Sequence, residues 1–308
     1  MSTLARRIVG LVVVVFLISG AATLLRGGVY GWTIFVLFPV VLGGLASWMF
    51  RPASGTRAAG LGALTVMAAT CSLSVLGLEG LLCILMSLPL VIPLGALGGW
   101  LVYQAERSKL ATRSVTMLML LPAATLTWDT KAPPVEFEVR TAIVIAASPE
   151  QVWKHVVTFS EIPEPGEWLF RTGLAYPKRA RIEGSGPGAI RYCEFSTGPF
   201  VEPIEIWDKP RLLQFRVTNN PAPMHEWSIY AQVMPKHLHG YMVSRRGQFR
   251  FTGLANGRTL LEGTTWYQHG LWPAEYWRWW SDAIIHRVHL RVLNHVRMLA
   301  EQESERSW

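Results

Sequence analysis

Apolar residues dominate the first 130 positions of the chain. Four long apolar stretches lie there, over residues 8–25, 32–50, 58–78 and 81–103. Each has 18 to 23 residues, close to the roughly 20 that a helix needs to cross the hydrocarbon core of a bilayer. Only three of the acidic residues and none of the eight histidines fall in this half. The pattern predicts a multi-pass, all-α membrane region over residues 1–130, of the kind found in a bacterial inner membrane.

A fifth apolar stretch, residues 114–128, leaves the number of spans open because it is only 15 residues long and contains Pro122. Basic residues cluster at positions 6–7, 51–57 and 107–113, and the positive-inside rule places these clusters in the cytoplasm. With five spans the C-terminal half lies outside the cytoplasm. With four spans, the fifth stretch being an interfacial helix, it lies inside. We favour five spans.

The pattern changes after a short Pro-containing linker at residues 131–134. A β-like run over residues 139–145 leads to Ser148, Pro149 and Gln151, which together make the start of a helix with an S-x-x-Q capping box. Alternating runs then predict strands, with a hairpin turn at Asn256-Gly257. The predicted strands cover residues 178–183, 189–195, 200–207, 211–217, 241–254 and 258–269.

The last 30 residues or so have the pattern of a long amphipathic helix. Pro273 can open it, and apolar residues recur at spacings of three and four up to about residue 300. This apolar stripe consists of Trp277, Trp280, Ile284, Val288, Val292, Val296 and Leu299.

A strand followed by the capped Ser-Pro-Glu-Gln-Val-Trp helix at residues 148–153 resembles the opening of the START-like helix-grip (SRPBCC) superfamily, which includes polyketide cyclase/dehydrase-type and lipid-transfer domains. The order of elements over roughly residues 135–300 is also similar to that superfamily. The resemblance implies an α+β helix-grip domain, in which a curved antiparallel sheet surrounds a long C-terminal helix and a ligand cavity lies between them. It implies a hydrophobic small molecule or lipid as partner and no cofactor.

Two glutamates are candidate catalytic residues. Glu194 shares a strand face with Tyr192, and Glu262 shares one with Trp266, by the two-residue period of a strand. If the Glu262 face lines the cavity, burial favours the protonated carboxyl and suits it for general acid–base catalysis. The alternative, which we favour, is that these glutamates pair with arginines across the sheet. The candidate arginines are Arg191, Arg245, Arg246 and Arg250.

Histidines supply the other candidate acid–base groups. His225 precedes Glu226 in a Pro-rich loop, and His269 ends the last predicted strand; for His225, an exposed loop position is the commoner case. His237-x-His239 has no accompanying Cys or His-Glu spacing, so no metal site is predicted. The histidines of the last helix are expected to face solvent or neighbouring carboxylates. They are His286, His289 and His295.

Ligand-binding residues are expected among the aromatic and polar side chains of the last strand and helix. Trp277 and Trp280 belong to the apolar stripe and are core residues by default, whereas Trp272 and Trp279 fit that stripe less well. Functionally, these four can line the cavity or touch the membrane surface, and contact of at least one of them with the cavity is as plausible as none. The candidate ligand-binding residues are Tyr192, Trp266, Tyr267, Arg245, Trp277 and Trp280.

The net charge of +8 does not indicate a nucleic-acid partner, because five of these charges belong to residues 1–130 and topology accounts for them. Cys71, Cys83 and Cys193 have no disulfide or metal spacing. The sequence therefore predicts a membrane-anchored, extracytoplasmic domain that binds a hydrophobic small molecule or lipid. The alternatives are a cyclase/dehydrase-type enzyme that uses Glu262 or Glu194 with His225 or His269, and an interaction module with a filled interior. The oligomeric state stays open.

Overall fold

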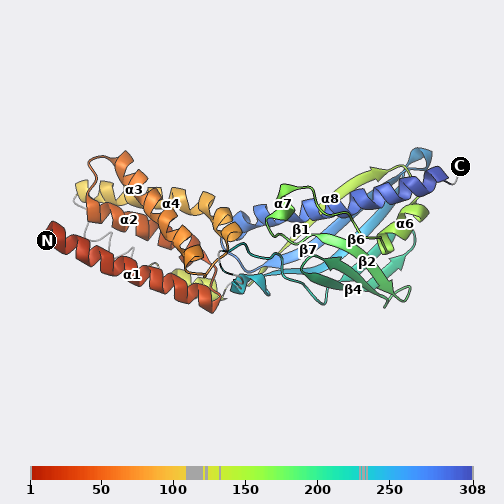
Figure 1. Ribbon diagram of the computed structural model, residues 1–308, viewed down its shortest axis with the longest axis horizontal. Coiled ribbons are helices and arrows are strands. Elements are labelled where there is room, and N and C mark those ends of the chain that lie inside the picture. Colours follow the sequence, from red (N-terminus) through yellow and green to blue (C-terminus); the bar gives the residue numbers. More distant parts are fainter. Residues whose placement is uncertain are drawn as a thin grey trace. The chain divides into compact units, whose positions relative to one another are not determined.

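The computed structural model describes residues 2–108, 121, 124–131, 133–228, 230, 233 and 235–306 (Figure 1). The chain divides into two compact units. Unit 1 contains Met1–Pro133 and two short segments from much later in the sequence, Glu226–His237 and Leu271–Pro273. Unit 2 contains the remainder, Pro134–His225, Leu238–Gly270 and Ala274–Trp308. A cut at the linker before residue 134 therefore separates unit 1 from two of its own segments.

Unit 1 contains four helices that are long and apolar enough to cross a membrane. They coincide with the four long apolar stretches, whose helical nature is thereby confirmed. The fifth stretch, residues 114–128, lies mostly outside the described residues. The helices are α1 (Thr3–Gly27), α2 (Phe38–Phe50) with the preceding π-helical turn η1 (Thr33–Leu37), α3 (Gly55–Val75) and α4 (Leu81–Arg107).

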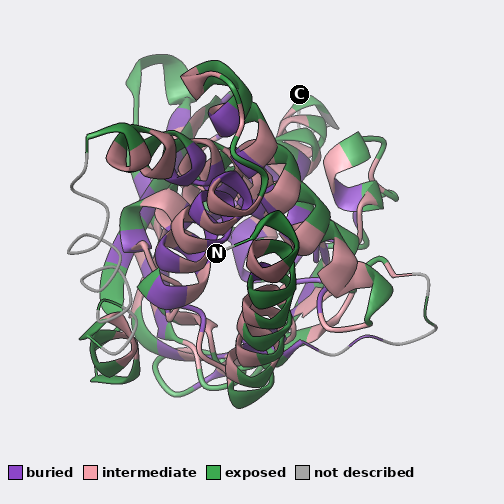
Figure 2. Ribbon diagram, turned by 90° about the vertical axis from the view of Figure 1, so that its left-hand side faces the viewer, coloured by how far each residue is buried: buried purple, intermediate pink, exposed green. Residues whose placement is uncertain are grey.

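Glycines allow helices α2, α3 and α4 to approach one another closely. A Cβ atom placed on Gly43 or Gly62 would lie 2.1 or 2.2 Å from the carbonyl oxygen of Gly95, so neither position tolerates a side chain. Small residues at helix contacts are the usual packing solution in lipid, where dispersion and close approach replace the hydrophobic effect. Much of α1 is exposed (Figure 2). Its exposed apolar side chains include Phe16, which is 76% exposed.

The two ends of this helical region have different polar contacts. At one end, Glu106 of α4 forms ion pairs of 3.8 Å with Arg6 and Arg51. At the other end, the carboxylate of Asp129 accepts hydrogen bonds from the backbone N–H groups of Trp32 (2.8 Å) and Thr33 (2.9 Å). Residue 107 and residue 129 therefore lie at opposite ends of the helices of unit 1.

Unit 2 is an α+β domain with a seven-stranded antiparallel sheet, in the order β1-β7-β6-β5-β4-β3-β2. The fold class predicted from the sequence, a helix-grip domain preceded by apolar helices, is confirmed. The strands are β1 (Val135–Ile145), β2 (Pro177–Glu183), β3 (Ile190–Phe195), β4 (Gly198–Asp208), β5 (Leu212–Arg216), β6 (Met242–Gly253) and β7 (Thr259–His269). The helices are α6 (Pro149–Val157), α7 (Trp168–Arg171) and α8 (Ala274–Arg306), with a 3₁₀ turn η3 (Ala255–Gly257). A further 3₁₀ turn, η2 (Lys236–Leu238), falls where the late segment of unit 1 ends along the chain.

Local sequence signals account for the ends of several elements. The side chains of Ser148 and Gln151 form the complete capping box at the start of α6. Asn256 and Gly257 both have left-handed backbones, with φ of 62° and 70°, as a tight turn between β6 and β7 requires. Strand β1 begins at Val135, four residues before the predicted run. It pairs with β7 along its whole length.

Helix α8 packs on one face of the sheet, which we call the inner face; the other is the outer face. Along β7, Leu261, Thr265 and Tyr267 point to the inner face, and Thr265 and Tyr267 hydrogen-bond to α8. The alternate residues, including Glu262 and Trp266, point to the outer face. The main core lies between the inner face, α6 and α8. Its largest members are Ile145, Val152, Trp153, Val156, Phe159, Leu213, Phe215, Phe251, Leu261, Leu293 and Val296.

Candidate functional site

A strip of neutral polar side chains crosses the inner face. His289 of α8 hydrogen-bonds through Nδ1 to Thr141 of β1 (3.1 Å) and through Nε2 to Thr265 of β7 (2.8 Å). His286 also contacts the Thr141 hydroxyl, at 2.8 Å. Burial, and secondarily the neighbouring His286, lower the pKa of His289 to about 4. The His289 imidazole is therefore neutral at pH 7.

The carboxylate of Asp282 lies between a tyrosine and an arginine. The Tyr267 hydroxyl, on a fully buried side chain, donates to Asp282 Oδ1 at 2.6 Å. Arg278 of the same helix donates to Asp282 Oδ2 at 3.2 Å. Burial and the bond to Asp282 raise the pKa of Tyr267 above its ordinary value, so the phenol keeps its proton. Asp282 is thus charge-paired and occupied as an acceptor.

An arginine–glutamate pair is buried under the other half of the sheet. Arg191 of β3 and Glu202 of β4 are direct cross-strand partners, 1% and 6% exposed, and form a hydrogen-bonded ion pair. Arg191 also donates to the carbonyl oxygens of Val156 and Val157 at the end of α6. Burial is the largest single effect on the pKa of Arg191 and lowers it, but the attraction and hydrogen bonds of Glu202 and Cys193 together raise the pKa above its ordinary value. The pair satisfies its own charge inside the domain.

Cys193 follows Arg191 on the same face and does not have the properties of a nucleophile. Burial is the main cause that raises the pKa of its thiol to about 12, and the nearby Glu202 adds to it against the opposing pull of Arg191. A reactive cysteine needs a lowered pKa and access to solvent. The Cys193 thiol is a packing group.

Aromatic side chains surround the polar strip near the start of α8. His269 stacks on Phe137 with ring centroids 5.0 Å apart, and Tyr267 lies 5.7 Å from the same ring. Trp277 is 5% exposed. The Nε1 atom of Trp280 is buried and has no hydrogen-bond partner among the described residues. The inner-face side chains at this end of the interior, Phe137, Tyr267 and His269, therefore give it a mainly aromatic surface.

The outer face holds several of the residues predicted for the site. Glu262 lies 4.0 Å from Arg140, its nearest cationic contact. The Trp266 indole donates to Glu138 at 3.0 Å and lies under the guanidinium of Arg246. Arg245 donates to Gln268 from an exposed position. Helix α8 does not cover this face, so these groups do not line the interior.

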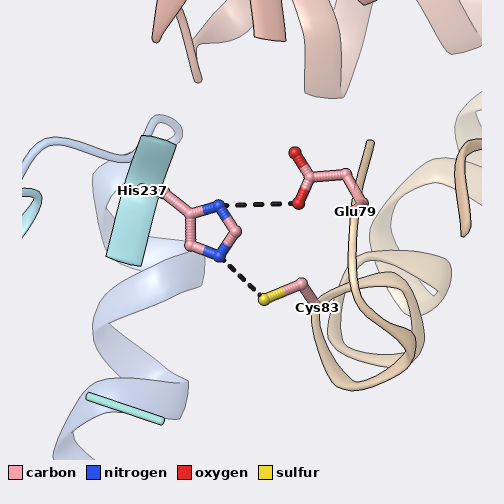
Figure 3. Close-up of side chains that lie close together, drawn as sticks. All are labelled: Glu79, Cys83 and His237. Carbon is pink, nitrogen blue, oxygen red and sulfur yellow. Dashed lines mark hydrogen bonds and ion pairs between the residues drawn. The ribbon is translucent and has the colours of Figure 1, made fainter. Parts of the chain in front are cut away.

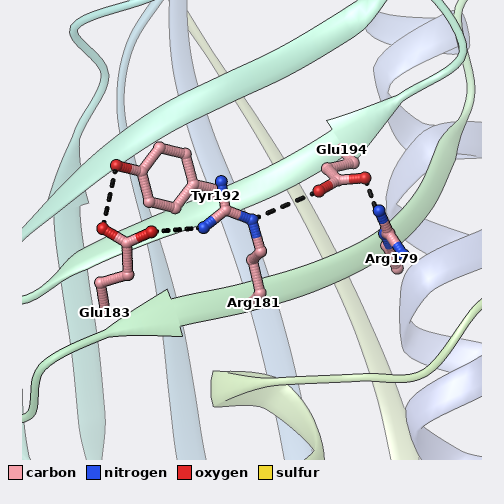
Figure 4. A network of polar contacts seen from close by, with 5 residues as sticks. All are labelled: Arg179, Arg181, Glu183, Tyr192 and Glu194. Atoms are coloured by element: carbon pink, nitrogen blue, oxygen red, sulfur yellow. Dashed lines mark hydrogen bonds and ion pairs between the residues drawn. The ribbon is translucent and has the colours of Figure 1, made fainter.

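Tyr192 and Glu194 also lie on the outer face, in a network with β2 (Figure 4). Glu194 accepts from Arg179 at 2.7 Å and from Arg181 at 3.4 Å. The hydrogen bond from Arg179 is the main cause that lowers the pKa of the Glu194 carboxyl. Arg181 stacks on the Tyr192 ring, 3.9 Å from its centroid. The arrangement is the cross-strand pairing that the sequence favoured for the glutamates, although the arginines differ from those expected.

The remaining predicted histidine, His225, is exposed, and its backbone N–H donates to Gly173 at 2.8 Å. Its neighbour Glu226 belongs to unit 1. Of the predicted residues, the structure places Tyr267 and His269 on the inner face, beside Phe137. Their role in binding or catalysis stays a prediction.

Sequence reasoning missed the residues that make the interior polar. Arg191 shares a strand face with Ala189 and Cys193 by the two-residue period. The period does not indicate which of the two faces is buried. The expectation that the helix-α8 histidines face solvent or carboxylates is wrong for His295, which is 6% exposed and packs on Phe159. It is also wrong for His289, whose two ring nitrogens bond to threonines of the sheet.

Residues 136–270 match the sequence model of the family described as polyketide cyclase / dehydrase and lipid transport. Similar solved structures include a point mutant of norcoclaurine synthase from Thalictrum flavum in complex with a transition-state analogue (12% identity over 56% of this chain and 99% of that one, TM-score 0.36). Others are the ZhuI aromatase/cyclase from Streptomyces sp. R1128 (18% identity, 55% and 96%, TM-score 0.36) and the Aha1 dimer from Colwellia psychrerythraea (13% identity, 53% and 96%, TM-score 0.32). None of the curated proteins matches the chain. The family match covers residues 136–270, less than half of the chain, and the helix-grip fold of unit 2 agrees with it.

Proposed function

We propose that this protein is a membrane-anchored binder of a hydrophobic small molecule or lipid, which lies between the inner face of the sheet and helix α8. The observation that carries the proposal is the difference in chemistry between the faces. The described inner-face groups are apolar, neutral or paired within the domain, as for His289, Asp282 and Arg191. Such an interior gains about 25 cal/mol for each Å² of apolar ligand surface removed from water.

A few polar groups are placed to orient a ligand. The threonine hydroxyls of the polar strip, Thr141 and Thr265, can exchange their histidine partners for a ligand oxygen. A mainly apolar site with few convergent polar groups is the common design of small-molecule sites.

The enzyme alternative has less support. It requires a carboxylate in the interior that is free to exchange a proton with the ligand. Glu194 and Glu262, the two candidates, lie on the outer face beside arginines. Asp282 faces the interior but already accepts from Tyr267 and Arg278. A binding function does not require any of these carboxylates to exchange a proton with the ligand.

For the membrane side, the contacts within unit 1 favour an extracytoplasmic domain. Helix α4 ends beside Arg6 and Arg51, at the end that the positive-inside rule assigns to the cytoplasm. Asp129, four residues before the domain boundary at Pro133, contacts the opposite end through Trp32 and Thr33. The chain therefore enters unit 2 from the non-cytoplasmic end. Reporters fused to the C-terminus that are active on only one side of the membrane test this assignment.

The binding proposal is tested with the full chain, purified in a mild detergent and analysed by native mass spectrometry and lipid extraction. We expect an apolar species of defined mass to co-purify. Thr265→Phe, which fills the interior, should release it, whereas Glu262→Gln, three positions earlier on the outer face, should retain it. Equal retention by both variants, with both folded by circular dichroism, contradicts binding at the inner face.

A further inference from the structure

A second cluster of chemically active side chains lies in unit 1. Glu79 follows α3, and Cys83 is in the first turn of α4. Glu226 and His237 come from the late segment that belongs to the same unit. The ligand atoms of Glu79, Cys83 and His237 all lie within 4.8 Å of one another. Four residues from three parts of the sequence thus converge on one point.

The histidine ring divides the cluster into two sides. Figure 3 shows His237 with Nδ1 toward the Glu79 carboxylate and Nε2 toward the Cys83 thiol, at 3.5 and 3.0 Å. Glu226 Oε1 lies 3.5 Å from the same Nε2 atom and accepts from the Cys83 thiol at 2.6 Å. On the far side, Glu79 is held by a hydrogen bond of 2.8 Å from the buried Tyr30 hydroxyl.

The cluster does not balance its charge as the Arg191–Glu202 pair does. The side chains of Glu79 and Glu226 are 7% and 0% exposed, and in the described part of the chain their ion pairs are with His237 alone. Glu226 Oε2 and His237 Nδ1 are buried and have no hydrogen-bond partner among the described residues. Buried carboxylates with an unsatisfied oxygen are costly. A cation bound at this cluster offsets the negative charge of the two buried carboxylates.

We propose that Cys83 Sγ, His237 Nε2 and Glu226 Oε1 bind a divalent metal ion of the zinc class, and that Glu79 orients His237 from behind. Thiolate, imidazole and carboxylate together are ligands that zinc prefers. Ligand atoms around a tetrahedral zinc stand about 3.3 to 3.7 Å apart, so the observed separations of 2.6 to 3.5 Å open by a few tenths of an ångström or more on binding. A metal-bound histidine usually donates its other N–H to a carboxylate, the position that Glu79 occupies. On binding, the Cys83 thiol proton is released to solvent.

Cys83, His237 and Glu79 are also arranged like the nucleophile, base and orienting carboxylate of a cysteine enzyme. Their surroundings disfavour nucleophilic catalysis. A nucleophilic thiolate needs an electropositive environment. Cys83 instead donates to one carboxylate, and a second lies on the other side of the histidine. Only a cation supplies the positive charge that the thiolate needs here.

The backbone around the cluster fits the proposed role of Glu226. A Cβ atom on Gly80 would lie 1.8 Å from Glu226 Oε2, so the carboxylate reaches its position only because residue 80 is glycine. The backbone N–H of Leu81 also donates to the carbonyl of Trp227 at 2.8 Å, which fixes the residue next to Glu226. Both contacts hold the late segment against the start of α4 and preorganise the site.

The test is a titration of the full chain, purified in a mild detergent and stripped with a chelator, with Co²⁺ as the spectroscopic probe. We expect one Co²⁺ per chain, a thiolate-to-cobalt charge-transfer band, tetrahedral d–d bands, and displacement by Zn²⁺. Cys83→Ser should abolish the charge-transfer band. His237→Gln should weaken Zn²⁺ binding by more than about 100-fold, and Glu79→Gln by about 10- to 100-fold.

Two matched controls are available in the chain. Cys71 is an exposed cysteine of α3, and His239 is an exposed histidine two residues from His237. Cys71→Ser and His239→Gln should leave both spectrum and affinity unchanged. Absence of stoichiometric binding by the unmodified chain overturns the site whatever the variants do. Survival of the charge-transfer band in Cys83→Ser overturns it as well.

Discussion

The two faces of the unit 2 sheet have opposite chemistry, although they alternate along the same strands. On the outer face of β7 and β3, Glu262 and Glu194 lie beside arginines at partly exposed positions. On the inner face, the neighbouring residues Tyr267 and Arg191 are buried, and each has a fixed polar partner. The comparison shows that the two carboxylates predicted from the sequence as catalytic, Glu262 and Glu194, form ion pairs on the outer face. The charged groups of the interior are paired with one another.

Breaking the buried ion pair of the inner face should have the largest effect. Arg191→Met leaves the Glu202 carboxylate buried without its partner and should lower the free energy of unfolding by about 3–5 kcal/mol. The double variant Arg191→Met, Glu202→Leu should recover most of that loss, because it removes both charges. Denaturant unfolding of the full chain in lipid nanodiscs measures both. A single variant as stable as the unmodified chain would show that the pair is not buried.

The next largest effect on stability should come from acid, which protonates His289 in the polar strip. The pKa of His289 is about 4 in the folded protein and about 6.5 in an unfolded chain. Between these values the unfolded state binds more protons, so stability falls as the pH falls from 6.5 to 4. The loss amounts to roughly 3 kcal/mol for this one group.

The control for the acid effect is His289→Gln, which keeps a polar side chain but does not titrate. Its unfolding free energy should depend less steeply on pH over the same window. An identical pH dependence in the variant and the unmodified chain would mean that His289 is not held neutral by burial.

Removal of one inner-face hydrogen bond should have an intermediate effect. Tyr267→Phe deletes the donor to Asp282 and should cost about 1–3 kcal/mol, because the carboxylate loses a buried partner. Asp282 retains Arg278, which limits the loss. Thermal unfolding in nanodiscs measures the change, and a stabilised variant would contradict the placement of the hydroxyl on Asp282.

The outer face should respond least. Glu262→Gln and Glu194→Gln each remove the charge of an exposed or half-exposed ion pair, and such pairs contribute about 0–1 kcal/mol. Both variants should unfold within about 1 kcal/mol of the unmodified chain. A loss as large as that of Arg191→Met would erase the distinction between the two faces.

The sequence predicts the elements of this molecule better than their environment. Hydrophobic period, the Ser148 capping box and the Asn256-Gly257 turn give every strand of unit 2 and the long helix α8, because these signals are local. The phase of each strand is not local. Leu260 and Leu261 are equally apolar, and only packing on α8 decides that Leu261 faces inward.

The polar cluster of unit 1 and the Arg191–Glu202 pair could not be predicted from the sequence, for a related reason. Cys83 and His237 are separated by 154 positions, and Glu226 and Cys83 by 143. No spacing rule connects such residues. Their approach depends on the late segment Glu226–His237 belonging to unit 1, which no periodicity indicates. The same holds for Arg191 and Glu202, whose pairing follows from the register of β3 and β4.

The most direct test of the central claim is ligand retention by two variants of one strand. The full chain, Thr265→Phe and Glu262→Gln would be purified in parallel, and their co-purifying apolar species would be quantified by native mass spectrometry. The account predicts retention by the unmodified chain and Glu262→Gln, and loss from Thr265→Phe. Retention by a folded Thr265→Phe together with loss from Glu262→Gln would place the ligand on the outer face and contradict the account.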